Sequence, residues 1–391
     1  MSRLSARAEW IKLCQFLNVP ADEFAFLTDL PSAELRSARV ALQEQWVAVA
    51  RARFVRLARW LRWLPIVVLA FFAQRWLGAV LVARIASELP SARAAVVARR
   101  LPADFLAQVA PLLDPRRARD LIRQLEHAQI VAIALALLQR GDHQTMGRFV
   151  DYMEDDAVRT VIDHIDDDAD LLRAVFFVES RNRLDHLVRL LPAERLQRAI
   201  LLLADVNCPV LVEIMALVVG VSYSLKRTLG DLAAEQGAPV LTQIVQTTQA
   251  LQCWADVLPV VAAMSVDSQR KVCALPVLQQ QPQILDAILQ AADAEGLWPQ
   301  VLPLIAMLPQ ALRRHVARAA EALSQDTLFR IADATLLTEQ WSAVLEIVVH
   351  FSPAKQQAVL AIVRGYAAVD AELSGRLLAL AAAADINTGL S

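Results

Sequence analysis

Three copies of one pattern decide the fold: Trp254-Ala-Asp-Val-Leu-Pro-Val-Val-Ala262, Trp298-Pro-Gln-Val-Leu-Pro-Leu-Ile-Ala306 and Trp341-Ser-Ala-Val-Leu-Glu-Ile-Val-Val349. The tryptophans lie 44 and 43 positions apart. Each is followed by valine three positions on, leucine four positions on and a β-branched residue seven positions on. Apolar residues at this spacing form one stripe along an α-helix.

A turn and a second amphipathic segment follow each copy. A period of about 40 to 47 residues built from two helices is typical of HEAT-like α-solenoids. A two-helix unit cannot bury its apolar stripe alone, so neighbouring units must stack. We therefore predict an all-α fold, an α-solenoid of helical hairpin repeats with the tryptophans packed between repeats. Pro259 and Pro303 should make the first helix of their copies start near the proline or kink there.

The composition agrees with a helical, cytoplasmic protein. Of 391 residues, 56% are hydrophobic, and only ten are glycine and three tyrosine. The formal charge of −2 argues against a general nucleic-acid binder, which would be basic. The four cysteines are scattered, so neither a zinc site nor a disulfide framework is expected. The N-terminus lacks the apolar core of a secretory signal peptide.

Composition divides the chain into four parts: an N-terminal helical segment (1–44), a basic and apolar segment (45–88), a first repeat block (89–232) and a second repeat block (240–391). The glycine and proline of 233–239 mark the expected joint between the two blocks.

The segment 45–87 contains seven arginines and no acidic residue. On a helical wheel its arginines and tryptophans gather on one half and its aliphatic residues on the other, as in helices that lie on membrane surfaces. Three interpretations stay open: burial in the first repeats, contact with a membrane surface, and a bilayer span over 64–83 that would place Arg75 near mid-span. The predicted membrane or partner contacts are Arg51, Arg53, Arg56, Arg59, Trp60, Arg62 and Trp63.

Residues 101–122, Leu-Pro-Ala-Asp-Phe-Leu-Ala-Gln-Val-Ala-Pro-Leu-Leu-Asp-Pro-Arg-Arg-Ala-Arg-Asp-Leu-Ile, place two proline-marked helix starts 13 positions apart, and 191–200 give a looser echo. Here the chain resembles the cytosolic N-terminal superhelix of MgtE-type magnesium transporters, over about 90–200. The resemblance covers only that cytosolic part, so transport is not implied. The whole chain is also similar to a set of uncharacterised bacterial helical-repeat proteins.

Residues 151–170 contain nine acidic residues and one arginine, a formal charge of −8. Carboxylates directly before an apolar run oppose the helix dipole and can cap the helix, which favours a structural role on a solvated face. Binding of a basic partner and of a divalent cation are the alternatives, although the EF-hand spacing is missing. The candidate acidic partner patch is Asp151, Asp155, Asp156, Asp163, Asp166 and Asp167.

We expect no catalytic residues, no metal ligands and no cofactor. The adjacent Asp185 and His186 have no candidate nucleophile, and glycine-rich phosphate loops are absent from the sequence. The expected function is a non-enzymatic scaffold that binds a protein partner, with the inner face of a membrane as one location and an anionic membrane surface or lipid as a second partner. The alternative is a carrier or sensor of an apolar small molecule or lipid.

Overall fold

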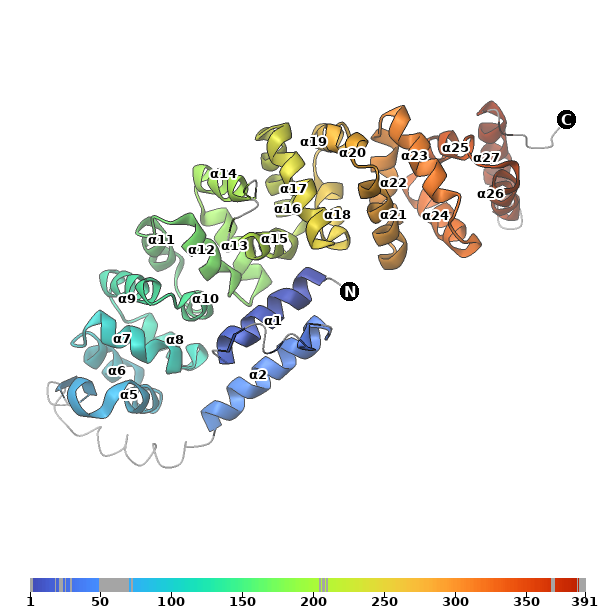
Figure 1. Ribbon diagram of the computed structural model, residues 1–391. Coiled ribbons are helices and arrows are strands. Elements are labelled where there is room, and N and C mark those ends of the chain that lie inside the picture. Colours follow the sequence, from blue (N-terminus) through green and yellow to red (C-terminus); the bar gives the residue numbers. More distant parts are fainter. Residues whose placement is uncertain are drawn as a thin grey trace. The chain divides into compact units, whose positions relative to one another are not determined.

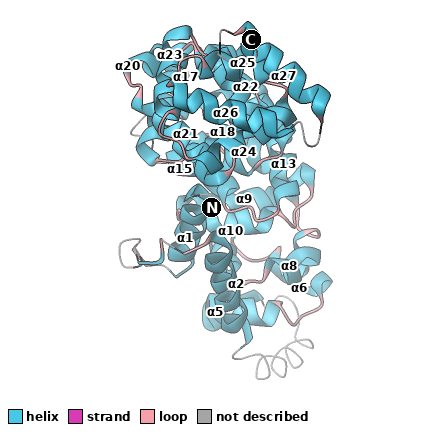
Figure 2. Cartoon of the chain, turned by 90° about the vertical axis from the view of Figure 1, so that its right-hand side faces the viewer, coloured by secondary structure: helices cyan, strands magenta, loops and turns pink. Residues whose placement is uncertain are grey.

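The computed structural model describes residues 3–48 and 70–386, except 18, 21–23, 25, 29, 72, 204, 206–207, 209, 367–369 and 385. For residues 3, 5 and 43–48 it describes the backbone alone. All regular secondary structure in the described residues is helical, which confirms the all-α prediction (Figure 1, Figure 2). The chain forms an N-terminal unit (Leu4–Ala199 and Pro209–Val221) and a C-terminal unit (Met1–Arg3, Ile200–Cys208 and Ser222–Ser391).

Short helices make up the chain as far as Val221. They are α1 (Arg3–Leu17), α2 (Ser32–Ala48), η2 (Ala73–Leu77), α5 (Gly78–Ala86), α6 (Ser91–Ala98), α7 (Ala103–Val109), η3 (Ala110–Leu112), α8 (Pro115–Ile122), α9 (His127–Gln139), α10 (His143–Val150), α11 (Asp155–Asp163), α12 (Asp168–Phe176), α13 (Arg181–Leu190), α14 (Ala193–Leu202) and α15 (Leu211–Gly220).

In the N-terminal unit several helices pack against the next but one, for example α7 against α9, α9 against α11 and α10 against α12, whereas α12 packs against α15. The predicted helix starts are confirmed: Pro102 directly precedes α7, and Pro115 is the first residue of α8. The Asp114 side chain caps α8 by accepting a hydrogen bond from Arg116 N at 3.0 Å. Proline costs nothing at a first turn because its N–H would be unpaired there.

Gly147 is the point of closest approach between α10 and α12. A Cβ at this position would lie 2.3 Å from Ala174 O and 2.5 Å from Phe177 Cβ. A glycine inside a helix costs about 1 kcal/mol relative to alanine, so its presence requires a reason. Here the reason is contact between the backbones of two helices.

The C-terminal unit continues with α16 (Tyr223–Glu235), α17 (Ala238–Leu251), α18 (Trp254–Ala263), α19 (Val266–Cys273), α20 (Pro276–Gln280), α21 (Gln283–Glu295), α22 (Trp298–Met307), α23 (Gln310–Ala320), α24 (Gln325–Thr338), α25 (Trp341–Val348), α26 (Pro353–Gly365) and α27 (Ala371–Ala383). The joint expected at 233–239 lies within this unit, where Gly237 (φ 97°) separates α16 from α17.

The three tryptophan-led copies begin in the same backbone conformation. Two residues before each tryptophan the preceding helix ends in a left-handed residue, with φ of 52°, 68° and 55° at Gln252, Gly296 and Glu339. Each tryptophan is then the first residue of its helix, α18, α22 or α25. The three rings are buried in one core, with 5%, 2% and 6% of their surface exposed.

Each period contains three main helices instead of the two expected from the sequence. The second copy consists of α22, α23 and α24. The additional boundary comes at Ser324, whose Oγ caps α24 by accepting a hydrogen bond from Thr327 N at 3.1 Å. In the first copy the corresponding boundary is Pro282, before α21, and the short helix α20 is an additional element between α19 and α21.

The prolines do not mark the start of the first helices. α18 and α22 begin at their tryptophans and run through Pro259 and Pro303, which lie inside these helices. The third copy has Glu346 at this position, and Glu346 forms an ion pair with Arg313 of α23 in the preceding copy.

Candidate functional site

The predicted basic contact residues lie outside the described residues: Arg51, Arg53, Arg56, Arg59, Trp60, Arg62 and Trp63. The chain that follows them is described from Ala70, and it combines core with exposed surface. Ala73, Val82 and Ala83 are buried against α6 and α7, whereas Trp76 is 75% exposed. None of the helices that the structure describes has both the length and the apolar character needed to cross a bilayer.

The acidic patch is spread over the end of α10, the helix α11 and the start of α12. Asp156, Asp163 and Asp166 are exposed. The side chain of Asp156 is 81% exposed, and its ion pair with Arg159 is long, at 3.7 Å. Asp167 caps α12 by accepting a hydrogen bond from Ala169 N at 2.8 Å, as the structural interpretation predicts.

Asp155 takes part in a structural contact that the sequence did not reveal. Its Oδ1 accepts a hydrogen bond from Arg183 Nη1 and its Oδ2 lies against His186 Nε2, both at 2.6 Å. Arg183 also donates to Val150 O at 3.1 Å and Met153 O at 2.8 Å, so it binds both ends of the loop between α10 and α11. Hydrogen bonds from Arg183, and then from His186, lower the pKa of Asp155.

The next loop is held in the same way, by Arg195. This arginine donates to Asp168 Oδ1, Ile162 O and Ile165 O at 2.7, 2.7 and 2.5 Å. Burial alone would raise the pKa of Asp168, but hydrogen bonds from Arg198 and Arg195 hold it below its usual value. We call Arg183 and Arg195, with their acceptors, the arginine clamps. Each arginine follows its aspartate by 28 or 27 residues.

Asp151 differs from the rest of the patch. It is half-buried at the end of α10, and its Oδ1 is buried without a hydrogen-bond partner among the described residues. Burial raises the pKa of Asp151, more than the nearby amides of Glu179 and Ser180 lower it. Four of the six predicted residues are therefore exposed: Asp156, Asp163, Asp166 and Asp167, of which Asp167 also caps α12, whereas Asp151 and Asp155 are half-buried.

A buried ion pair holds the α1–α2 hairpin on the N-terminal unit. Arg39 of α2 is 2% exposed; its Nη1 donates to Glu179 Oε1 at 2.7 Å and its Nη2 to Glu9 Oε2 at 3.1 Å. Ala8 and Ile11 of α1 pack beside this pair on apolar side chains at the end of α12 and in α15. Burial would raise the pKa of Glu179, but the charge and hydrogen bonds of Arg39 lower it.

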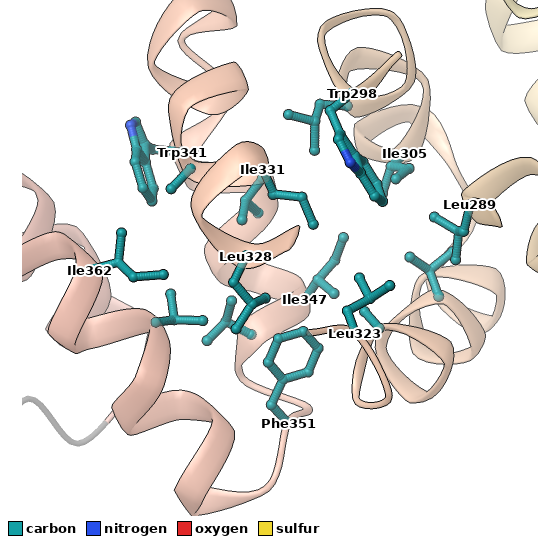
Figure 3. A pocket seen from close by; sticks show the side chains of 17 residues that line it. Leu289, Trp298, Ile305, Leu323, Leu328, Ile331, Trp341, Ile347, Phe351 and Ile362 are labelled. Atoms are coloured by element: carbon teal, nitrogen blue, oxygen red, sulfur yellow. The ribbon is translucent and has the colours of Figure 1, made fainter. Parts of the chain in front are cut away.

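The C-terminal unit contains an apolar cavity of about 50 Å³ among α22, α23, α24, α25 and α26 (Figure 3). Trp298 and Trp341 lie on two sides of it, and Leu328, Ile331 and Phe351 line it between them. This volume is about a third of the roughly 150 Å³ of an engineered apolar cavity that binds benzene. The cavity therefore has room only for an apolar guest smaller than benzene.

The three tryptophans differ at their indole nitrogens. Trp254 Nε1 donates to Gln249 Oε1 at 2.7 Å and Trp298 Nε1 to Asp293 Oδ1 at 3.4 Å, each five residues upstream. Leu336 occupies the corresponding position for Trp341. The buried Nε1 of Trp341 accordingly has no hydrogen-bond partner in the described part of the chain.

Three histidines contact an aspartate: His143, His186 and His315. The partner of His186 is Asp155, which also binds Arg183. His143 contacts Asp170 at 2.8 Å. Within the described ranges, no group of three or more His, Cys, Asp or Glu side chains is placed to hold a metal ion.

Comparisons of the chain with protein-family models, with curated proteins and with solved structures give no match. The resemblance of residues 90–200 to MgtE-type cytosolic domains stays a prediction.

Proposed function

We propose that this chain is an α-solenoid scaffold that binds a basic protein partner at the inner face of a membrane. The observation that carries the proposal is the shared start of the three tryptophan-led copies, each with a left-handed residue two positions before the tryptophan. Repetition of one junction at a fixed period is what a stack of repeats requires. Such stacks present extended faces on which partners bind.

The acidic patch supplies the charge that a basic partner would recognise. Asp156, Asp163 and Asp166 are the exposed carboxylates left after the arginine clamps and the cap of α12 have taken Asp155 and Asp167. Exposed charges of one sign raise the rate of association and contribute less at high salt. We therefore propose that these three residues form the outer part of the partner contact.

The test compares capture by two variants that each lose three acidic residues. In the first, Asp156, Asp163 and Asp166 become asparagine. In the matched control, Asp267 and Asp326 become asparagine and Glu372 becomes glutamine; these exposed residues belong to the C-terminal unit. Proteins retained by immobilised full-length chain are compared by mass spectrometry.

The proposal expects a protein that wild type and the control retain and that the patch variant loses. Release of this protein should follow when ionic strength rises from about 0.1 M to about 1 M, which shortens the Debye length from about 10 Å to about 3 Å. If every retained protein binds the patch variant as well as wild type, the acidic contact is wrong.

The cavity beside Trp298 and Trp341 favours a second function, binding of a small apolar molecule. Its lining is almost entirely aliphatic and aromatic, and empty cavities of this kind take up apolar guests. Xenon added to the protein at saturating concentration should shift the NMR signals of Ile331 and Leu328. Unchanged signals at both residues would contradict the binding of an apolar molecule in this cavity.

A further inference from the structure

Three large apolar side chains are exposed within ten residues at the beginning of α5. Phe71, Trp76 and Val80 expose 62%, 75% and 55% of their surface. Single exposed apolar residues are normal on proteins, whereas neighbouring ones mark surfaces that bind something. We call Phe71, Trp76 and Val80 the aromatic surface.

The fold holds the aromatic surface in place from behind. Ala73 lies between Phe71 and Trp76, and Val82 and Ala83 follow Val80; all three are buried with Val97 and Leu101 in a core shared with α6 and α7. The backbone of this stretch is therefore anchored while Trp76 and Val80 are exposed. Gly78, the first residue of α5, has a φ of 69°, and Trp76 and Val80 lie on either side of it in η2 and α5.

The chain on either side of the aromatic surface carries charge of one sign in its sequence. Arg75 is exposed beside Trp76, and Arg84 lies one turn beyond Val80. The sequence contains no acidic residue between Glu44 and Glu88 and seven arginines in the same stretch. Anionic bilayers attract arginine and take tryptophan at the level of the headgroups.

We propose that the aromatic surface, with Arg75 beside it, seats on an anionic lipid bilayer and inserts Phe71, Trp76 and Val80 at the boundary between headgroups and acyl chains. The proposal rests on the membrane location included in the proposed function and names the residues that make the contact. Insertion of apolar side chains adds to the electrostatic attraction of the arginines, so loss of either should weaken binding.

The experiment measures co-sedimentation of the full-length protein with vesicles of phosphatidylcholine, alone or mixed with phosphatidylglycerol. The test variant carries Trp76→Ser and Val80→Asp. The matched control carries Tyr223→Ser and Leu337→Asp, because these two apolar side chains are 67% and 79% exposed in the C-terminal unit. Circular dichroism confirms that both variants keep their helix content.

We expect wild type and the control to bind the anionic vesicles, and the test variant to bind them about tenfold more weakly or worse. Arg75→Gln should weaken binding to the anionic vesicles by about fivefold, the effect of one basic residue at such a surface. Two outcomes overturn the proposal: wild type that does not sediment with the anionic vesicles, and a test variant that binds as well as the control.

The protein-partner experiment separates this proposal from the proposed function. If the wild-type protein does not bind vesicles while the acidic-patch variant still loses a captured protein, only the proposed membrane contact is wrong. If the Trp76→Ser, Val80→Asp variant loses a captured protein and wild type ignores vesicles, the aromatic surface binds a protein and the membrane proposal is wrong.

Discussion

Replacement of Gly147 by alanine tests the packing of α10 on α12 directly. The new Cβ would meet Phe177 Cβ at 2.5 Å and Ala174 O at 2.3 Å, whereas carbon atoms prefer about 3.5–4.0 Å. The helices must separate by about 1 Å, because neither contacted atom lies at the end of a flexible side chain. Overpacking lowers the free energy of unfolding by about 1–3 kcal/mol, whereas the higher helix propensity of alanine raises it by about 1 kcal/mol. We expect the free energy of unfolding to fall by about 2 kcal/mol, the upper end of the range that these two effects leave.

Two further glycine substitutions provide the controls. Gly375 lies inside α27 with nothing within 4 Å of a Cβ, so Gly375→Ala should stabilise its unit by about 0.5–1 kcal/mol. Gly230→Ala would meet Met264 Cγ at 2.6 Å, and the flexible thioether can move aside, so its loss should be smaller than that of Gly147→Ala.

Urea unfolding followed by circular dichroism measures all three variants, and hydrogen exchange of amides in α10 and α12 assigns the loss to the N-terminal unit. In a domain of 150–250 residues a loss of this size lowers Tm by about 4–8 °C. A Gly147→Ala protein as stable as wild type would show that α10 and α12 do not approach as the structure has them.

Three further outcomes are expected. Leu336→Gln should restore the acceptor that Trp341 Nε1 lacks, raising the urea midpoint by the equivalent of about 1 kcal/mol, and a lower midpoint would count against it. Arg39→Ala should lower the free energy of unfolding, measured with urea, by about 3 kcal/mol. This is the lower end of the range for a broken buried ion pair, because Glu179 is 30% exposed. A second substitution, Glu179→Gln, should recover part of the lost stability because it removes the unpaired charge. The free energy of unfolding should fall on acidification, because the pKa values of Glu179 and Asp168 are lowered in the folded protein. The stability that these two carboxylates contribute is complete above their unfolded pKa values of about 4, and it is lost as pH drops through their folded pKa values. Urea midpoints between about pH 6 and pH 3 measure this, and an unchanged midpoint would contradict it.

The all-helical fold and the shared starts of the three tryptophan-led copies could be predicted because their signal is local. Tryptophan, valine and leucine at fixed spacing mark one helix face, and the structure places Trp254, Trp298 and Trp341 at three equivalent helix starts. The left-handed junctions were not predictable in the same way. Only Gly296 has a residue type that indicates a left-handed junction, whereas Gln252 and Glu339 adopt this conformation against the preference of their residue types.

The prediction of two helices in each period is wrong for a related reason. A Ser cap such as Ser324 is visible in the sequence, but serine occurs elsewhere in helices too. Only the break between α23, which ends at Ala320, and α24, which begins at Gln325, shows that this serine starts a helix of its own.

The acidic patch shows where reading one segment at a time fails. Its charge is obvious from the sequence, and the cap at Asp167 follows from local rules. The partners of Asp155 and Asp168 lie 28 and 27 residues downstream, and Arg39 meets Glu179 across 140 residues. A search for aspartate–arginine pairs separated by 27 or 28 residues would have found the first two contacts, but no local signal reveals the third.

The arginine clamps also decide which carboxylates a partner can use. A carboxylate that accepts hydrogen bonds from a half-buried arginine cannot leave it without exposing an unpaired cation and freeing the carbonyls that the arginine binds. Asp155 and Asp168 are therefore committed to holding the loops on either side of α11. Asp156 and Asp163 belong to the helix between those fixed loops, so their carboxylates keep a constant spacing. Removing either clamp should thus disturb partner binding even though the clamped aspartates make no contact with the partner.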